Sequence, residues 1–418
     1  MATHQKFGQF FTILIILLIT GLPLQAQKVA VVLSGGGSRG TAHIGVLKAL
    51  EENNIPIDYV AGTSIGALVG ALYASGYSPD EMERIFTSTD FQRWSSGIMN
   101  QDITYFYKKD EPDAGWVNLN LDFSKNISGI LPTNFVSPIE MNFMLMQLFS
   151  GASAVAEYNF DNLFVPYRCT ASDIDSNKMV VLRKGDLGKS VRASLTFPFY
   201  FKPIEIDNRL LFDGGMYNNF PADVATQDFS PDFIIGSKVA GNYPKPHPDD
   251  ILTQIQNMLM TDTDFGLDPE TGILIEPRVE KVSLIDFSMA KAFIDSGYVT
   301  TLRHLPEIKE RVKIPRSREE VIAKRTEFNN KKPAYIIDSV SIKGMNNRSN
   351  EYVNRSLFHK STKVTLAEIT DDYLQLAADD ILKMGTSCMK YHPGRGHYEL
   401  CMDMQPAEKF VLKFGGNI

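Results

Sequence analysis

The chain has 418 residues, a length that suits two or three domains better than one. Hydrophobic residues make up 44% of it and charged residues 22%, a globular composition that excludes global disorder. The formal net charge of -7 provides no electrostatic attraction to nucleic acid, so no nucleic-acid partner is expected.

Residues 1–26 have the pattern of a secretory signal peptide. Lys6 precedes an apolar run from Phe10 to Ile19, and the segment ends at the small residue Ala26. An uncleaved membrane anchor is the alternative, but the run is shorter than the roughly 20 residues that a spanning helix needs. The sequence predicts cleavage near Ala26 and export of the mature chain from the reducing cytosol.

Strand and helix patterns alternate through residues 27–305, which is typical of an α/β domain. A β-branched run at 28–33 predicts a strand buried on both faces of a parallel sheet. Residues 42–50 repeat apolar side chains at helical spacing, and a second strand at 59–61 leads into a helix at 67–74.

The pattern changes after residue 305. Residues 306–333 are rich in Lys, Arg and Glu and predict a solvated helical linker. Residues 334–408 then predict a small β-α-α-β-β domain, and residues 409–418 begin a further strand.

Two of the three cysteines lie in the predicted final hairpin. Cys388 and Cys401 are equidistant from the centre of the Pro393–Gly396 turn, so antiparallel pairing sets them opposite each other. Facing residues on antiparallel strands are close enough for a disulfide, and we predict that bond. Cys169 is left as a buried free thiol.

A glycine-rich loop, "GGGSRG", joins the first predicted strand to the first helix. Gly35, Gly37 and Gly40 fit the G-x-G-x-x-G fingerprint of dinucleotide-binding folds. A P-loop is excluded because no Gly-Lys-Ser/Thr follows. The acidic residue that a dinucleotide site needs after the second strand is also missing, since Asp58 precedes that strand.

A second motif, "GTSIG", follows the second strand and fits the nucleophile elbow G-x-S-x-G. Gly62 and Gly66 flank Ser64 because the sharp strand-to-helix turn leaves little room for Cβ atoms. A serine nucleophile also needs donors for the developing oxyanion. The amides of Gly35–Gly37 at a helix N-terminus are suitable donors, so the glycine loop is interpreted as an oxyanion hole.

The base is less clear from spacing alone. Asp213 ends an apolar strand, and Gly214 and Gly215 after it allow another segment to approach closely. An aspartate that caps its own β-turn is the structural alternative. His247 follows Asp213 and could complete a Ser-Asp-His triad, although its proline-rich surroundings indicate an exposed loop.

In this order the motifs "GGGSRG", "GTSIG" and "DGG" resemble the patatin-like phospholipase family over about residues 28–305. The resemblance implies a three-layer α/β/α domain with a mostly parallel central sheet. It also implies a Ser-Asp dyad without histidine, with Ser64 as nucleophile and Asp213 as general base. The implied oxyanion loop consists of Gly35, Gly36, Gly37 and Arg39.

Residues 334–408 resemble a POTRA domain, a periplasmic module attached to outer-membrane barrels, and residues 409–418 resemble the first strand of such a barrel. This resemblance implies a place in the periplasm, at the outer membrane or at the cell surface. It rests on the order of elements rather than on signature residues.

Together these features predict an exported serine lipolytic acyl hydrolase, with a lipid or phospholipid substrate, a membrane surface as partner, and no metal or organic cofactor. Met144 and Phe149 are candidates for acyl-chain contact, with packing in the hydrophobic core as the alternative. The alternatives are an outer-membrane assembly or surface module with an inactive hydrolase-like domain, and a dinucleotide-dependent oxidoreductase.

Overall fold

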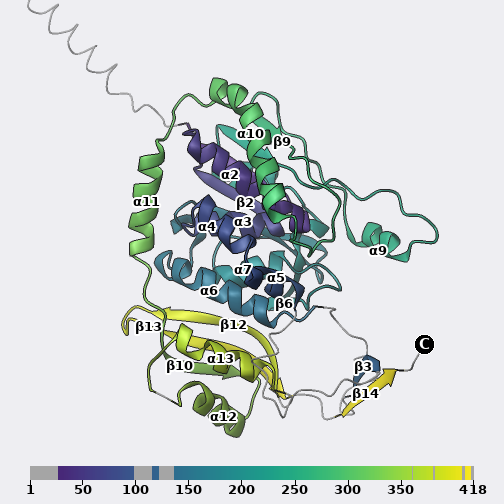
Figure 1. The fold of residues 1–418 in the computed structure, drawn as a ribbon, viewed down its shortest axis with the longest axis vertical. Helices are drawn as coiled ribbons and strands as arrows, with labels where there is room; N and C mark the ends of the chain where they lie inside the picture. The colour runs from purple at the N-terminus through teal and green to yellow at the C-terminus, as the bar shows by residue number, and fades with distance from the viewer. Residues whose placement is uncertain are drawn as a thin grey trace, which may run out of the picture.

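A computed structural model describes residues 27–97, 115–121, 136–359, 361–379, 382–406 and 410–415. The predicted signal peptide lies outside these residues. Figure 1 shows a large unit built around a sheet and a smaller unit below it, formed by about the last fifth of the chain. Among the described residues, no helix combines the length and the apolar character needed to cross a bilayer.

The large unit contains an eight-stranded, mostly parallel sheet, as predicted. The strand order is β6-β7-β4-β2-β1-β8-β9, with β5 paired to β4. Its parallel strands are β1 (Val29–Leu33), β2 (Tyr59–Thr63), β4 (Tyr167–Asp173), β8 (Phe233–Ser237) and β9 (Gly272–Ile275). Strands β5 (Lys178–Leu182) and β7 (Arg209–Asp213) each pair antiparallel with β4, and β6 (Ile204–Ile206) pairs antiparallel with β7.

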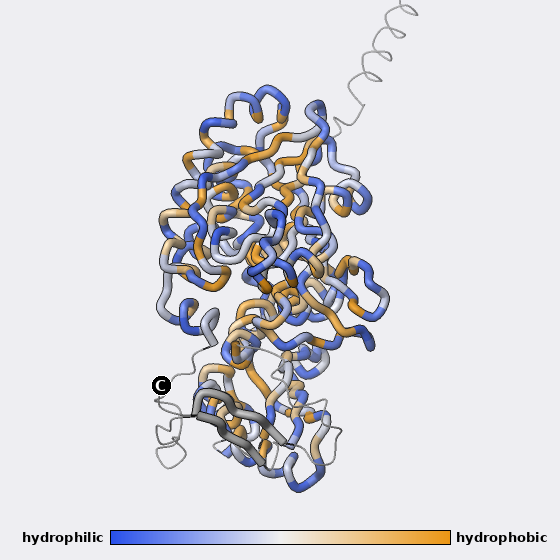
Figure 2. Tube along the Cα trace, turned by 90° about the vertical axis from the view of Figure 1, so that its right-hand side faces the viewer, coloured by the Kyte–Doolittle hydropathy of each residue, from blue (hydrophilic) through white to orange (hydrophobic). Residues whose placement is uncertain are grey.

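Helices cover both faces of this sheet. They are α2 (Ala42–Glu52), α3 (Ile65–Ala74), α4 (Pro79–Phe86), α5 (Thr89–Ser96), α6 (Ile139–Val155), α7 (Leu187–Ser194), α8 (Ala222–Phe229), α9 (Ile251–Leu259) and α10 (Ala290–Arg311). Alternate residues of β1 enter different clusters: Val31 belongs to the larger core and Val32 to a smaller one on the opposite face. Figure 2 shows hydrophobic segments inside the large unit and hydrophilic ones along its outline.

Helix α10 corrects the predicted domain boundary at residue 305, because it continues through Pro306 to Arg311. It packs against α2 at very close range: a Cβ atom on Gly45 would meet the Ile294 carbonyl, and one on Gly297 would meet that of Ala42. The helix is therefore held by the large unit along its length. A proline inside a helix removes one backbone hydrogen bond and so favours a helix end, but here the contacts of α10 with the large unit stabilise the helix beyond Pro306.

The charged segment after α10 forms the helical connector that was predicted, α11 (Arg318–Asn330), which runs along the large unit toward the small one (Figure 1). One part of the prediction is wrong, since α11 is not solvated on all sides. Arg325 is 6% exposed and forms two hydrogen bonds to the Glu51 carboxylate. This buried ion pair fixes the connector to α2.

The small unit has the predicted β-α-α-β-β order with one added two-residue strand. Its elements are β10 (Ile336–Lys343), α12 (Asn347–Leu357), β11 (Val364–Thr365), α13 (Leu366–Ala377), β12 (Leu382–His392) and β13 (His397–Pro406). The sheet order is β11-β10-β13-β12, with β10 parallel to β13. The strand predicted within 409–418 is β14 (Phe410–Gly415), and it pairs with β3 (Gly115–Leu121).

Strands β12 and β13 place Cys388 directly opposite Cys401, as the turn position predicted. The disulfide itself is not formed in the structure, where both cysteines are free thiols. Their sulfur atoms share a hydrogen bond instead. A two-electron oxidation separates this state from a disulfide, so the same strand register is compatible with either.

We predict that oxidised glutathione links Cys388 to Cys401 and leaves Cys169 reduced, because Cys169 is completely buried. The bond should raise the free energy of unfolding of the small unit by about 2–3 kcal/mol. Peptide mapping under non-reducing conditions and urea unfolding test this, with Cys388→Ser as control. Thiols that both stay free after oxidation would contradict the prediction.

Candidate active site

Ser64 lies at the turn between β2 and α3 with φ 55° and ψ -124°, a strained conformation for a residue with a side chain. The two glycines around it are required by space. A Cβ atom on Gly62 would meet the Gly66 carbonyl, and one on Gly66 would lie 2.6 Å from the Ser34 oxygen. The turn therefore has the geometry of a nucleophile elbow.

Strand β4 brings Asp213 to Ser64. Thr63, which precedes the serine, pairs with Thr170 of β4, and Asp213 of β7 pairs with the next β4 residue, Ala171. Ser64 Oγ donates a 2.6 Å hydrogen bond to Asp213 Oδ2. The structure thus brings into contact the two residues that the sequence analysis named as candidate nucleophile and candidate base.

The Asp213 carboxylate is 3% exposed and is held from its other side by the Gly215 amide, 2.8 Å from Oδ1. Gly214 passes so close to β4 that a Cβ atom there would lie 2.5 Å from the Thr170 carbonyl oxygen. Burial raises the pKa of Asp213 to about 6, although the hydrogen bonds from Ser64 and Gly215 oppose the shift. A carboxylate with this pKa is a much better base than an exposed one.

Two of the three predicted loop amides are available as oxyanion donors. Gly36 and Gly37 line the cavity in front of Ser64, and within the described residues neither amide donates to a protein acceptor. The assignment of Gly35 as a donor is wrong, because its N–H donates to the Asn219 carbonyl at 3.1 Å. Gly35 instead provides clearance, since a Cβ atom there would lie 3.1 Å from Ser64 Cβ.

Arg39 supports the loop rather than pointing away from it. Its Nε donates to the Gly36 carbonyl at 3.1 Å, which orients the peptide next to the free amides. The side chain also lines the cavity, and partial burial lowers the pKa of its guanidinium. It contributes positive charge near the predicted oxyanion position.

Two further residues position the site and were not selected from the sequence. Ser194 Oγ, at the end of α7, accepts the Ser64 amide hydrogen at 2.8 Å and so fixes the elbow. Asn219 holds Gly35 and lines the cavity. Both residues lie within residues 28–305, over which the family resemblance extends, but neither belongs to the three motifs that carry it, because their roles depend on the fold.

The histidine alternative has no support in this geometry. His247 is exposed, and its Nδ1 accepts the Asp249 amide in its own loop. His43 is buried between Ser34 and Ser237, and burial lowers its pKa to about 4, so it is a neutral packing residue. Of the candidate bases, Asp213 is the one whose side chain is hydrogen-bonded to Ser64 in the described part of the chain.

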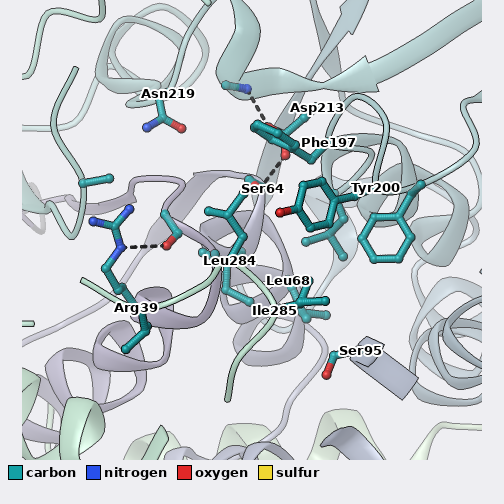
Figure 3. Close-up of a pocket in the computed structure, with 18 of the residues that line it drawn as sticks. Arg39, Ser64, Leu68, Ser95, Phe197, Tyr200, Asp213, Asn219, Leu284 and Ile285 are labelled. Carbon is teal, nitrogen blue, oxygen red and sulfur yellow. Dashed lines mark hydrogen bonds between the residues drawn. The ribbon is translucent and has the colours of Figure 1, made fainter. Parts of the chain in front are cut away.

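The cavity in front of Ser64 has a volume of about 420 Å³. In Figure 3, Arg39 and Asn219 lie on one side of Ser64, and Leu68, Phe197 and Tyr200 lie on the other. Met144 lines the apolar part, as expected, but Phe149 does not and belongs to the core. The apolar part suits a hydrocarbon chain, and the polar part suits a charged or hydrogen-bonding group.

Comparison with known proteins agrees with this site. The model of the family "Patatin-like phospholipase" matches residues 31–226, which include Ser64 and Asp213. Residues 31–226 are a patatin-like phospholipase domain.

Curated relatives share this domain. Human patatin-like phospholipase domain-containing protein 6 is 32% identical over 212 residues, which cover 48% of this chain and 13% of that protein. Lysophospholipase NTE1 of Kluyveromyces lactis is 25% identical over 325 residues, or 70% of this chain and 20% of that one. The chain therefore spans only about an eighth to a fifth of these relatives.

Among solved structures, VipD from Legionella pneumophila is similar with a TM-score of 0.37 and 11% identity. The match covers 73% of this chain and 74% of that one.

The pKa of Asp213 predicts how the patatin-like domain responds to pH. Only the deprotonated carboxylate accepts the Ser64 proton, so activity should fall as pH drops through about 6 and be about tenfold lower at pH 5 than its plateau. The measurement is kcat/KM for a soluble short-chain ester between pH 5 and 8. A flat profile over this range, with the protein folded throughout, would contradict the assignment.

Proposed function

We propose that the protein is a lipolytic serine hydrolase that cleaves acyl esters of phospholipids. The observation that carries the proposal is the 2.6 Å hydrogen bond between Ser64 and the buried Asp213, at the head of a cavity that is apolar on one side. Patatin-like phospholipase is also the description of the matching family.

In the proposed reaction, Asp213 accepts the Ser64 proton as Oγ attacks the ester carbonyl carbon. The amides of Gly36 and Gly37 donate to the oxygen that becomes negative. The tetrahedral intermediate collapses to an acyl-enzyme, and Asp213 returns the proton to the departing alcohol. Water, deprotonated by Asp213, then attacks the acyl carbon and releases the fatty acid.

The polarity of the cavity favours one orientation of the substrate. The acyl chain occupies the side lined by Leu68, Phe197 and Ile285. The head group lies toward Arg39 and Lys281, whose positive charges suit a phosphodiester. This orientation leaves the ester carbonyl beside Ser64.

A membrane surface is the proposed source of the substrate. Helix α9 projects from the large unit (Figure 1), and Ile251 and Met258 on it are 70% and 84% exposed. Tyr243 and Met260, on either side of this helix, line the cavity. Insertion of the apolar side chains into a bilayer would bring the cavity mouth to the lipid.

We also propose export by cleavage of the signal peptide and a POTRA-like role for the small unit. The POTRA-like role is supported by the β-α-α-β-β order of the small unit, in which the parallel strands β10 and β13 are central. Under this proposal the hydrolase acts in the periplasm, at the outer membrane or at the cell surface.

Fatty acid release from phosphatidylcholine and lysophosphatidylcholine tests the proposed reaction. Wild-type protein should release fatty acid, and Asp213→Asn should reduce kcat by about 10²–10⁴, the usual contribution of a general base. Arg39→Gln should lower kcat as well as raise KM for phospholipid, because Arg39 both holds the Gly36 carbonyl of the loop and lines the cavity. Absence of release by folded wild-type protein would favour the surface-module alternative.

Met258→Asp tests the membrane contact. Loss of one inserted apolar side chain, worth about 1.5–3 kcal/mol, should weaken binding to phosphatidylcholine vesicles about tenfold or more. Hydrolysis of a soluble ester should not change. Ile322→Asp on α11, where Ile322 is 47% exposed, is the matched control, and an equal loss in both variants would contradict the role of α9.

The exported protein should begin near Gln27 when the full chain is expressed in a Gram-negative host. Intact-mass measurement of the periplasmic and membrane fractions tests this expectation. A chain that retains residues 1–26 in the cytosol would contradict export.

A further inference from the structure

Arg192 is a buried cation that lacks an anionic partner. It lies on α7, is 3% exposed, and donates to Asn142 Oδ1, Thr196 Oγ1 and the Lys202 carbonyl. None of these acceptors is charged, and within the described part of the chain no carboxylate forms an ion pair with its guanidinium. Burial of such a charge is costly unless an anion balances it.

The other two buried arginines among the described residues differ in that respect. Arg168 is 5% exposed and pairs with Asp228, and Arg325 is 6% exposed and pairs with Glu51. Elsewhere in this protein, therefore, carboxylates balance buried guanidinium groups. Arg192 requires a different explanation.

Arg192 lines a cavity of about 350 Å³ between the two units, where α6, α7 and β6 lie next to β12 (Figure 1). Three lysines from separate parts of the chain also line it: Lys202, Lys343 and Lys383. Among the described residues that line it, the acidic ones are Glu205 and Asp403, and Asp403 accepts a hydrogen bond from Thr386. Among these described lining residues, cationic side chains outnumber anionic ones, in a chain whose net charge is -7.

We propose that this cavity binds a phosphate-bearing anion. Guanidinium and ammonium groups are the side chains that best recognise phosphate, and the volume suits a small phosphate ester. The site is separate from the Ser64 cavity, and its binding does not depend on the proposed hydrolase activity. The phosphate is either soluble or carried by a lipid head group.

Helix α7 connects the two cavities. Two residues after Arg192, Ser194 accepts the Ser64 amide hydrogen. The Arg192 guanidinium also lies 5.2 Å from the centre of the Phe201 ring, which lines the Ser64 cavity. An anion that fixes Arg192 should therefore alter the reactivity of Ser64, and by linkage an occupied Ser64 cavity should alter anion affinity.

Calorimetric titration of the full-length Ser64→Ala protein with glycerol 3-phosphate, at constant ionic strength, tests whether the cavity binds a soluble phosphate ester. Saturable binding should weaken at least tenfold in the Lys343→Gln/Lys383→Gln double variant, because both lysines are exposed and can be changed without disturbing the core. Lys390→Gln, an exposed lysine on the same strand β12 but outside the cavity, should bind like the parent.

Cosedimentation with phosphatidylcholine vesicles, with and without phosphatidic acid, tests whether the cavity binds a phosphate carried by a lipid head group. Phosphatidic-acid-dependent binding that the double variant loses and Lys390→Gln retains would identify a lipid-borne phosphate. Binding of neither probe, or equal weakening in all variants, would overturn the site. Anion binding that leaves the rate of fluorophosphonate labelling at Ser64 unchanged would overturn the coupling through α7.

Discussion

The short hydrogen bond between Ser64 and Asp213 depends on keeping a carboxylate out of water. Asp213 is buried at the end of β7, so its pKa rises to about 6 and it can act as a base without a histidine. If water reached this carboxylate, its basicity would fall toward that of an exposed aspartate. The β-sheet register and the apolar cavity wall both preserve this environment.

Close packing at glycines makes that arrangement possible. Gly62 and Gly66 allow the strained elbow, Gly35 allows the loop to pass beside Ser64, and Gly214 allows β7 to turn against β4. Ser194 then fixes the elbow from α7. These contacts come from segments that are far apart in the sequence, so the dyad is only as precise as the packing of the sheet and its helices.

Sequence reasoning identified the elements whose signals are local. Ser64 and Asp213 could be selected because flanking glycines and preceding strands are visible in the sequence, and alternate strand and helix patterns gave the fold class. The direction of the Gly35 amide, the partner of Ser64 N–H and the path of α10 past Pro306 depend on tertiary contacts that no local pattern encodes. The Cys388 and Cys401 register follows from the turn, whereas their oxidation state does not.

Labelling of the purified protein with a fluorophosphonate, followed by peptide mapping and a rate measurement, tests the central claim most directly. The account predicts a single labelled serine, Ser64, and a rate that falls at least a hundredfold in Asp213→Asn and stays unchanged in His247→Ala. A folded wild-type protein that is not labelled, or an Asp213→Asn protein labelled at the wild-type rate, would contradict activation of Ser64 by Asp213.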